Sequence, residues 1–146
     1  MFIEIKICEP QTKQEFKKYY ELRWKILRKP WKQPKGSEKD EREKEATHIM
    51  ACIDSKIVGI GRLHFNTEKE AQIRYMAIEE EYRRKGIGSL ILKELEKRAK
   101  EKGAEHIVLN AREKAVKFYK KHYYKTVKRT YTLFESINHW KMQKRL

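Results

Sequence analysis

Hydrophobic and polar residues alternate with a period of two along several stretches of the chain. Isoleucines at every second position within Phe2–Cys8 predict an opening strand with one apolar face. The runs His48–Ile53 and Lys56–Phe65 predict two further strands, which the two-residue connection Asp54-Ser55 would join as a hairpin. Gln72–Ile78 has the same character and follows a polar turn. These four segments predict an antiparallel meander.

Other stretches have the periodicity of a helix. Thr12 and Glu15 form a capping-box pattern, and the apolar residues that follow recur at helical spacing up to Pro30, which predicts one helix or two shorter ones. The segment Ile87–Lys102 carries an apolar stripe opposite charged residues, so it predicts a second, long helix that ends at a glycine. A shorter helix is expected from about Arg112 to Lys121.

The order of the elements predicts a mixed sheet. Glu105–Asn110 is an apolar strand after the long helix, and strand, helix and strand in succession form a crossover unit. We therefore expect Glu105–Asn110 to run parallel to Gln72–Ile78. Two final strands, Lys125–Phe134 and Ile137–Lys144, are joined by a turn. A chain of 146 residues fits a single domain spanning residues 1–146.

Composition narrows the partners that this domain could have. The chain has 36 lysines and arginines against 21 acidic residues, and its formal net charge of +15 favours a phosphorylated cofactor, a nucleic acid or an acidic surface. No apolar run approaches the roughly 20 residues that cross a bilayer, and the start lacks a signal-peptide core. We therefore expect a cytoplasmic protein with no membrane partner. The two cysteines, Cys8 and Cys52, support neither a disulfide scaffold nor a metal site, and we expect buried thiols.

A long charged segment, Pro30–Glu45, interrupts the first half of the chain. It contains almost no apolar residues, and Glu38, Asp40, Glu41 and Glu45 form an acidic cluster within a basic protein. The segment is either a solvated loop or a functional one. In the second case its carboxylates would attract a cationic amine, such as a polyamine or a lysine side chain.

A glycine-containing loop, Tyr82–Ser89, lies between a predicted strand and the long helix. Its glycines let the backbone approach a ligand closely, and the start of the helix adds about half a positive charge. Arg83, Arg84 and Lys85 add further attraction for phosphate. The spacing lacks the pattern of the nucleotide triphosphatases and the third glycine of the dinucleotide fingerprint. The loop therefore predicts an anion site of another kind.

The residues from Arg83 to Gly88, arginine-x-x-glycine-x-glycine, resemble the acetyl-CoA loop of the GNAT superfamily of N-acetyltransferases. The preceding Tyr75-Met76-Ala77-Ile78 looks like the fourth strand of that family. Leu109-Asn110-Ala111 and the segment Ala115–Tyr119 look like its second signature. The resemblance extends from about residue 4 to residue 144.

This resemblance implies the GNAT fold, an α/β architecture. Its sheet is mixed and mostly antiparallel, with six or seven strands, a V-shaped splay between strands four and five, and about four flanking helices. It also implies acetyl-CoA as the cofactor, with the pantetheine arm in the splay and the pyrophosphate on the loop. The cofactor-binding residues implied in this way are Met76, Ala77, Ile78, Arg83, Arg84, Lys85, Gly86, Ile87, Gly88, Ser89 and Asn110.

The activity implied is transfer of an acetyl group to a primary amine by direct attack in a ternary complex. The amine would belong to a small molecule or a protein, and the oligomeric state stays open, with a homodimer as one option. Tyr119 matches the tyrosine that protonates the leaving thiolate in family members, although it could instead be a packing residue of its helix. Asn110 could likewise be a helix cap.

Two departures from the family pattern affect the site. Tyr123-Tyr124 stands where the family usually has glycine-phenylalanine, so we expect the turn there to be made differently. Gln72 stands near the position of a glutamate base in some protein-acetylating relatives, and an amide cannot serve as a base. The base is therefore open among His48, His64, His139 and the acidic residues of the charged segment.

Two other functions remain open. From Arg112 onward the chain has eleven lysines and arginines and two acidic residues, and aromatic residues that could stack on bases stand among them, so this part could be a nucleic-acid-binding surface or merely a solvated face. These aromatic residues are Tyr123, Tyr124, Tyr131 and Trp140. The chain could also bind acyl-CoA as a sensor without turnover.

Overall fold

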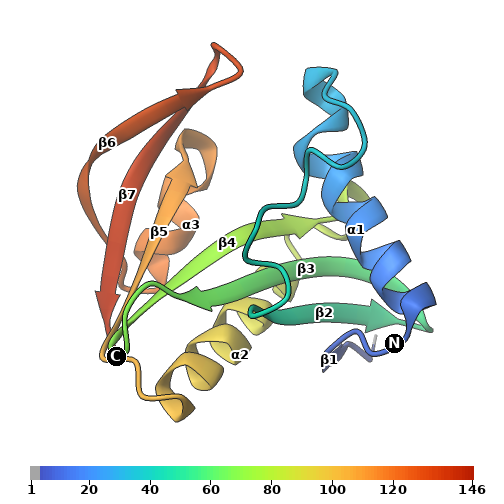
Figure 1. Ribbon diagram of the computed structural model, residues 1–146, viewed down its shortest axis with the longest axis horizontal. Helices are drawn as coiled ribbons and strands as arrows, with labels where there is room; N and C mark the ends of the chain where they lie inside the picture. Colours follow the sequence, from blue (N-terminus) through green and yellow to red (C-terminus); the bar gives the residue numbers. More distant parts are fainter. Residues whose placement is uncertain (1–3) are drawn as a thin grey trace.

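The computed structural model describes residues 4–146, which form a seven-stranded mixed sheet with helices on both faces (Figure 1). The strand order is β1-β2-β3-β4-β5-β7-β6, and the neighbouring strands are antiparallel except for β4 and β5. The strands are β1 (Lys6–Cys8), β2 (Thr47–Ile53), β3 (Lys56–Phe65), β4 (Glu70–Ile78), β5 (His106–Arg112), β6 (Lys125–Leu133) and β7 (Ile137–Arg145). The mixed sheet and the parallel pair confirm the predicted α/β fold.

The described helices are fewer than expected. They are α1 (Lys13–Leu27), α2 (Ile87–Glu101) and α3 (Val116–Lys121), with three short 3-10 turns, η1 (Lys29–Trp31), η2 (Glu80–Tyr82) and η3 (Glu113–Ala115). Three α-helices thus flank the sheet, where about four were expected. The first helix is unbroken, and the charged segment after it forms turns, because its acidic residues bind arginines of the sheet instead of continuing a helix.

The start of β1 and the turn between β2 and β3 can be compared with the predicted strands. The opening strand was predicted from Phe2. Residues 1–3 lie outside the described part, and β1 begins at Lys6. The hairpin between β2 and β3 is confirmed, with φ of 47° at Asp54 and 67° at Ser55. Both values are left-handed, as in the two-residue turns that suit the twist of a hairpin.

Each face of the β1–β4 half of the sheet carries its own apolar core. On one face α2 packs against β2, β3 and β4, with Ile49, Leu63 and Leu95 fully or almost fully buried. On the other face α1 covers residues that alternate with these, such as Met50 and Ile60. This alternation follows from the period of two in the strands.

The sheet divides between β4 and β5. Their ladder runs from Glu70, opposite His106, to Ile73, opposite Leu109, and beyond it the two strands no longer pair with each other. Just after this point β4 bulges, because Tyr75 has a left-handed φ of 61° and the register to β3 shifts. Figure 1 shows the two parts of the sheet diverging, which confirms the predicted splay.

Two compositional expectations can be compared with the structure. The cysteines are half-buried and not buried: Cys8 lies in β1 and Cys52 in the neighbouring β2. Burial raises the pKa of the Cys52 thiol to about 11. Within residues 4–146, no helix has the length and apolar character that crossing a membrane requires, and no cluster of three or more His, Cys, Asp or Glu residues could hold a metal ion.

Candidate functional site

The start of α2 leaves a row of backbone N–H groups without partners. Gly86 is the N-cap residue of α2, and no side chain caps this helix. The first bond across the helix start is donated by the Leu90 N–H to the Gly86 carbonyl, at 3.1 Å. None of the N–H groups from Arg84 to Ser89 donates to an acceptor in the described part of the chain. Because the positive end of the helix dipole lies behind them, these groups form an anion site.

The two glycines of this loop have different tasks. Gly86 has a left-handed φ of 80°, and a Cβ added there would meet nothing within 4 Å. Glycine is therefore favoured at this position by the backbone conformation and not by a lack of space. A Cβ added at Gly88 would lie 3.2 Å from the Phe118 ring, so this glycine lets α2 pack closely on α3. Only Gly86 therefore borders open space that a ligand could fill.

The cationic side chains of the loop are exposed. Arg83 donates from Nε to the Ile78 carbonyl at 3.3 Å, and the Lys85 ammonium lies 5.5 Å from the centre of the Tyr82 ring. Arg83, Arg84 and Lys85 make no ion pair with any residue from 4 to 146. Their charges thus add to the attraction of the open helix start for an anion.

The end of β4 lies next to this loop in the chain and has an open edge. Beyond Ile73, β4 pairs with β3 on one side and with no strand on the other, so Met76, Ala77 and Ile78 border the splay. Across the splay, Asn110 is half-buried in β5, and its side chain makes no hydrogen bond within the described residues. An extended ligand could pair with the open edge of β4 as an added strand does.

Tyr119 lies on α3 with its ring in the core and its hydroxyl unbonded. The residue is 6% exposed, and its ring packs edge-on against Phe118 and Tyr124. Burial raises its pKa, which keeps the phenol protonated. Within residues 4–146 its oxygen has no hydrogen-bond partner. This oxygen does not belong to the fully enclosed side-chain atoms without a partner, which are atoms of Arg23, Glu43 and Arg62. The hydroxyl is therefore free to donate a proton toward an accessible group.

The two tyrosines after α3 complete the turn without a glycine. Tyr123 has a left-handed φ of 70°, and the Tyr124 N–H donates to the Tyr119 carbonyl at 3.1 Å, so the helix ends in the way that a glycine usually allows. The expectation of a different turn was wrong. Tyr123 is 81% exposed, and the Tyr124 hydroxyl donates to Glu96 at 2.8 Å. Both are thereby less suited than Tyr119 to donate a proton.

Of the three histidines considered as a base, two are fully engaged. His48 bonds through its ring nitrogens to the Tyr19 hydroxyl (2.9 Å) and the Glu43 carbonyl (2.8 Å). The two ring nitrogens of His64 bond to the Arg62 guanidinium at 2.9 Å and to the side-chain oxygen of Asn66 at 3.1 Å. Neither ring offers a free lone pair to a substrate.

His139 differs from the other two. Its Nδ1 bonds to the Ile137 carbonyl at 3.0 Å, and because a carbonyl only accepts, Nδ1 carries the proton and Nε2 is left as an acceptor. The ring stacks on Tyr131 with 4.4 Å between centres. Burial lowers its pKa, as do the charges of Arg112 and Arg28, and this outweighs the hydrogen bonding to the Ile137 and Tyr131 carbonyls, which raises it. His139 therefore remains neutral near pH 7 and could accept a proton.

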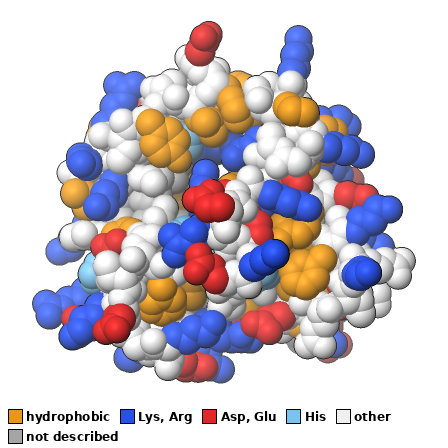
Figure 2. Space-filling model, in the orientation of Figure 1, with side chains coloured by type: hydrophobic (Ala, Val, Ile, Leu, Met, Phe, Trp, Pro, Cys, Tyr) orange, Lys and Arg blue, Asp and Glu red, His pale blue; other side chains and the backbone are white. Residues whose placement is uncertain are grey.

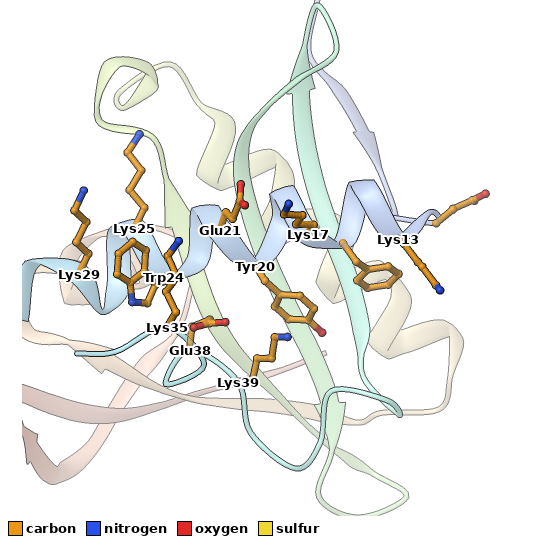
Figure 3. Close-up of a pocket in the computed structure, with 12 residues that line it drawn as sticks. Lys13, Lys17, Tyr20, Glu21, Trp24, Lys25, Lys29, Lys35, Glu38 and Lys39 are labelled. Carbon is orange, nitrogen blue, oxygen red and sulfur yellow. The ribbon is translucent and has the colours of Figure 1, made fainter. Parts of the chain in front are cut away.

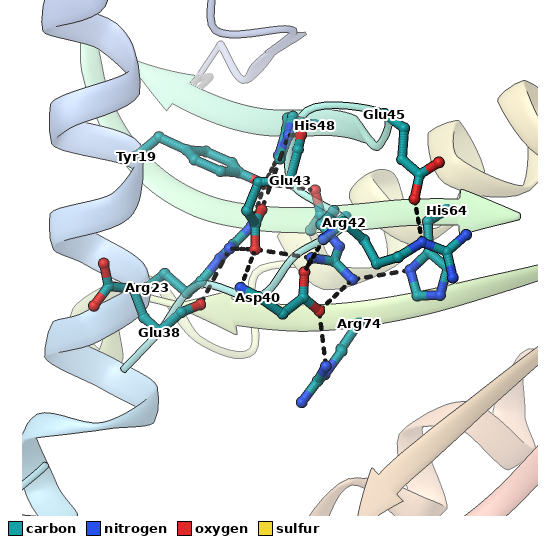
Figure 4. Close-up of polar contacts among 12 residues, drawn as sticks. Tyr19, Arg23, Glu38, Asp40, Arg42, Glu43, Glu45, His48, His64 and Arg74 are labelled. Carbon is teal, nitrogen blue, oxygen red and sulfur yellow. Dashed lines mark hydrogen bonds and ion pairs between the residues drawn. The ribbon is translucent and has the colours of Figure 1, made fainter. Parts of the chain in front are cut away.

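Glu38, Asp40 and Glu43 of the charged segment face inward (Figure 4), whereas Glu41 and Glu45 are exposed. Arg62, fully buried, donates to Asp40 at 2.6 Å and to Glu43 at 2.8 Å. Arg23, also fully buried, donates to Glu43 at 2.9 Å, and Arg74 donates to Asp40 at 2.8 Å. Burial opposes ionisation of Asp40, but the bonds to Arg62 outweigh it and hold its pKa below its usual range.

The expectation that this segment attracts a cationic amine stays a prediction, and among residues 4–146 only the exposed Glu41 of its predicted acidic cluster has no hydrogen bond or ion pair through its side chain. Asp40 and Glu43 already neutralise arginines of α1 and the sheet. Glu45 pairs with Arg42, and the Glu38 carboxylate accepts from the Gly36 N–H at 2.7 Å. Figure 2 shows acidic side chains dispersed among basic ones on this face, without an acidic surface.

Arginines gather around Tyr75 at the bulge of β4. The guanidinium carbons of Arg23, Arg74 and Arg62 lie 4.2, 4.6 and 4.9 Å from the centre of the Tyr75 ring, and that of Arg28 lies 5.7 Å away. Sequence reasoning missed this cluster, because its members come from α1, β3 and β4. The only signal was the arginine-containing first helix, which could not show what the side chains surround.

A cavity of about 790 Å³ lies elsewhere, along the outer face of α1 (Figure 3). Aromatic residues one helical turn apart, Phe16, Tyr20 and Trp24, form its floor, and lysines surround it. It contains none of the residues of the loop before α2, and Glu38 is the only residue of the predicted acidic cluster that lines it. The cavity is thus separate from the anion site.

Comparison with known proteins is consistent with this geometry. Residues 16–123 match the model of the acetyltransferase (GNAT) family. An uncharacterized N-acetyltransferase of Bacillus subtilis, YjcF, is 32% identical over 134 residues, which cover 92% of this chain and 95% of that protein. The chain belongs to the GNAT family.

Solved structures of other proteins show the same GNAT fold. Escherichia coli ElaA superposes with a TM-score of 0.82 at 14% identity, over 99% of this chain and all of ElaA. A GNAT acetyltransferase of Elizabethkingia anophelis with acetyl-CoA bound gives a TM-score of 0.80 at 17% identity, over 97% of this chain and 98% of that chain. Membership establishes an acetyltransferase family, whereas the amine that this member acetylates has to be inferred from its own residues.

Proposed function

We propose that the protein transfers the acetyl group of acetyl-CoA to a primary amine. The observation that carries this proposal is the open start of α2, where the N–H groups from Arg84 to Ser89 have no acceptor among residues 4–146 and three cationic side chains adjoin them. A structural helix start would be capped by the protein itself. An uncapped start next to an open strand edge suits a long ligand with a pyrophosphate at one end.

The chain offers a group for each part of such a ligand. The loop from Arg83 to Ser89 would hold the pyrophosphate, and the open edge of β4 from Met76 to Ile78 would pair with the amide groups of the pantetheine arm. Asn110, unbonded across the splay, would contact the same arm. Acetyl-CoA supplies an acetyl thioester, which an amine nitrogen attacks as the thiol departs.

Two protons have to move in this reaction, and two side chains are suited to move them. The amine must lose a proton, which Nε2 of the neutral His139 can accept. The departing thiolate must gain one, which the unbonded hydroxyl of Tyr119 can donate, since burial keeps that phenol protonated. The N–H groups near Met76 and Ala77, on the open side of β4, are the candidates to stabilise the oxygen that becomes negative.

The test is a screen of primary amines and peptides with acetyl-CoA, in which the free thiol of coenzyme A and the mass of the product are measured together. We expect thiol release that depends on the amine, and a product heavier by one acetyl group. Thiol release without an acetylated product would indicate hydrolysis and would contradict the proposal.

The two other functions predict different results in this screen and in a measurement of oligonucleotide binding. A sensor would bind acetyl-CoA without releasing thiol in the presence of any amine. A nucleic-acid-binding protein would bind oligonucleotides with an affinity that falls steeply with salt, and acetyl-CoA would not compete. Of the aromatic residues considered for stacking, Tyr123 and Tyr131 are exposed, whereas Tyr124 is buried.

A further inference from the structure

Two arginines meet at the C-terminal end of α1 without a carboxylate between them. Arg28 donates from Nη1 to the Leu27 carbonyl at 3.0 Å, and Arg112, at the end of β5, donates from Nη2 to the same oxygen at 3.1 Å. Arg28 also donates from Nε to the Ser37 carbonyl at 3.0 Å. No acidic side chain in the described residues forms an ion pair with either guanidinium.

The neighbouring arginines show what a purely structural arrangement looks like in this protein. Arg23 and Arg62 are fully buried, and each binds the carboxylate of Glu43 or Asp40. Arg28 is 7% exposed, and it has only neutral carbonyl oxygens as hydrogen-bond acceptors. Buried charges are usually paired, so the lack of an anion beside Arg28 and Arg112 needs an explanation.

The end of the helix does not supply enough negative charge. The C-terminus of α1 contributes about half a negative charge, against two positive guanidinium groups. Consistent with this imbalance, burial lowers the pKa of Arg28, and repulsion by Arg74 lowers it further. Burial also lowers the pKa of Arg112, with Arg28 adding to the effect. An anion between the two groups would relieve both penalties.

Free N–H groups remain to bind such an anion. Nη2 of Arg28 and both Nε and Nη1 of Arg112 have no acceptor within residues 4–146. They are also not sealed, since the enclosed side-chain atoms without a partner in this part of the chain belong to Arg23, Glu43 and Arg62. These donors are therefore not enclosed by protein atoms.

The location connects these donors to the proposed reaction. Arg112 follows Asn110 by two residues on β5, beyond the point where β4 and β5 separate, and it pairs in register with His139. The guanidinium of Arg28 lies near the ring of Tyr75, the residue before Met76. Both arginines thus lie near the part of the splay where β4 and β5 have separated, close in the fold to His139, the proposed base.

We propose that Arg28 and Arg112 bind a carboxylate or phosphate group carried by the amine acceptor. Two guanidinium groups with free, planar donors suit the oxygens of either anion. The acceptor would then be a small amine with a negative group near its nitrogen, such as an amino acid or an aminoalkyl phosphate. This proposal rests on the proposed function, because it names the acceptor of that same site.

The experiment compares pairs of amines with and without the anion, and each rate is expressed per unprotonated amine, because removing the anion also changes the pKa of the amine. Glycine is paired with glycinamide for the carboxylate, and phosphoethanolamine with ethanolamine for the phosphate. Acetyl transfer is measured with saturating acetyl-CoA, and binding of each compound is measured by calorimetry with coenzyme A already bound, so that the loop before α2 is occupied. We expect the anionic member of one pair to bind more tightly and to react faster.

Variants identify the residues. Arg112→Gln should raise the KM for the anionic acceptor about tenfold to hundredfold relative to the KM for its neutral partner, and leave the Kd of coenzyme A unchanged. The ratio within a pair is the measure, because the loss of Arg112 also alters the pKa of His139 and so affects both amines. Arg112→Lys should restore part of the loss, because it keeps the charge but not the planar donors. The matched control is Arg145→Gln, which removes the same charge about 20 Å away, at the other end of the β5–β7 pair.

Each outcome decides between the two proposals. Transfer to neutral amines as good as to anionic ones, or an Arg112→Gln loss that is equal for both members of a pair, would overturn the anion site and leave acetyl transfer standing. Binding of an anionic amine that depends on Arg112 but leads to no transfer would support the anion site and count against the enzymatic function. Absence of both binding and transfer would overturn the anion site for these ligands.

Discussion

The two long helices of this protein begin in opposite ways. α1 starts with a complete capping box, in which the Thr12 hydroxyl accepts from the Glu15 N–H and the Glu15 carboxylate accepts from the Thr12 N–H. α2 has the same length and starts at Gly86 with no side-chain cap. A helix start costs free energy when its N–H groups lack partners. The protein therefore stabilises one start itself and leaves the other for a ligand.

The same contrast separates two buried tyrosines, Tyr19 and Tyr119. The Tyr19 hydroxyl, on the inner face of α1, bonds to the Gly61 carbonyl, the Arg23 guanidinium and His48. The Tyr119 hydroxyl, on α3, bonds to nothing within residues 4–146. Tyr19 is thus tied into the fold by its hydroxyl, whereas the open hydroxyl of Tyr119 is available for chemistry.

The contrast is tested most severely at Gly86. We expect Gly86→Asp to weaken acetyl-CoA binding by more than about hundredfold, because it places a negative charge where the pyrophosphate is proposed to lie. Calorimetric titration with acetyl-CoA measures the effect. Gly86→Asn is the matched control, since asparagine has the same shape, tolerates the left-handed φ and carries no charge. Equal losses in the two variants would show that the backbone, and not an anion, decides binding.

Tyr119→Phe should lower kcat by about tenfold to ten-thousandfold while the stability and the Kd of acetyl-CoA change little, because the ring is retained and only an unbonded hydroxyl is lost. Single-turnover kinetics with the best amine measures the chemical step. Tyr19→Phe is the opposite control and should lower the free energy of unfolding by about 1–3 kcal/mol, since its partners are left buried. If Tyr119→Phe reacts at the parental rate, the acid is another group.

Asp40→Asn tests whether the ion pairs of the charged segment stabilise the fold. Asp40→Asn leaves Arg62 with Glu43 as its one carboxylate, which Arg23 shares, and we expect a loss of about 1–3 kcal/mol in the free energy of unfolding. Chemical denaturation measures it. Asp54→Asn, on the exposed hairpin turn, makes the same chemical change and should stay within about 0.5 kcal/mol of the parent.

The same residue predicts a dependence on pH. The folded pKa of Asp40 lies below its unfolded value, so its contribution to stability is complete above about pH 4 and is lost as the pH falls through the folded pKa. His48 adds a loss at higher pH, because burial lowers its pKa and protonation below about pH 6.5 favours the unfolded chain. In Asp40→Asn the loss below pH 4 should be smaller, and an unchanged acid limb would contradict this assignment.

Thr12→Ala should have the smallest effect, a loss of about 1 kcal/mol in the free energy of unfolding. Acetyl-CoA binding should not change, since the capped start of α1 has no proposed ligand. Thermal unfolding with and without acetyl-CoA measures both. If Thr12→Ala weakened acetyl-CoA binding as much as Gly86→Asp, the difference between the two helix starts would have no functional meaning.

Most of the fold could be predicted from the sequence because the periodicity is local. Strands of period two and the amphipathic segment Ile87–Lys102 carry their own signal, and the crossover rule sets the direction of β5. The predicted loop Tyr82–Ser89 was visible for the same reason, since its glycines, charges and helix start are adjacent in the chain.

What the sequence concealed depends on long-range contacts. Arg112 binds the Leu27 carbonyl from 85 residues away, and no spacing rule connects them. The acidic segment was expected to face an amine, because in sequence Asp40 has no visible partner, whereas in the fold Arg62 lies beside it. Tyr123 shows a third limit, since a left-handed tyrosine is uncommon and tertiary packing decides it.

The divided sheet also affects how the backbone exchanges its amide hydrogens with water. From Arg74 to Ile78, β4 has a ladder on the β3 side only, so about every second amide in this stretch lacks a bonded partner. These amides should exchange their hydrogens quickly in the free protein, although their neighbours in the same strand are protected. A ligand that pairs with this edge would slow the same few amides, which makes hydrogen exchange at Met76 and its neighbours a residue-level measure of occupancy.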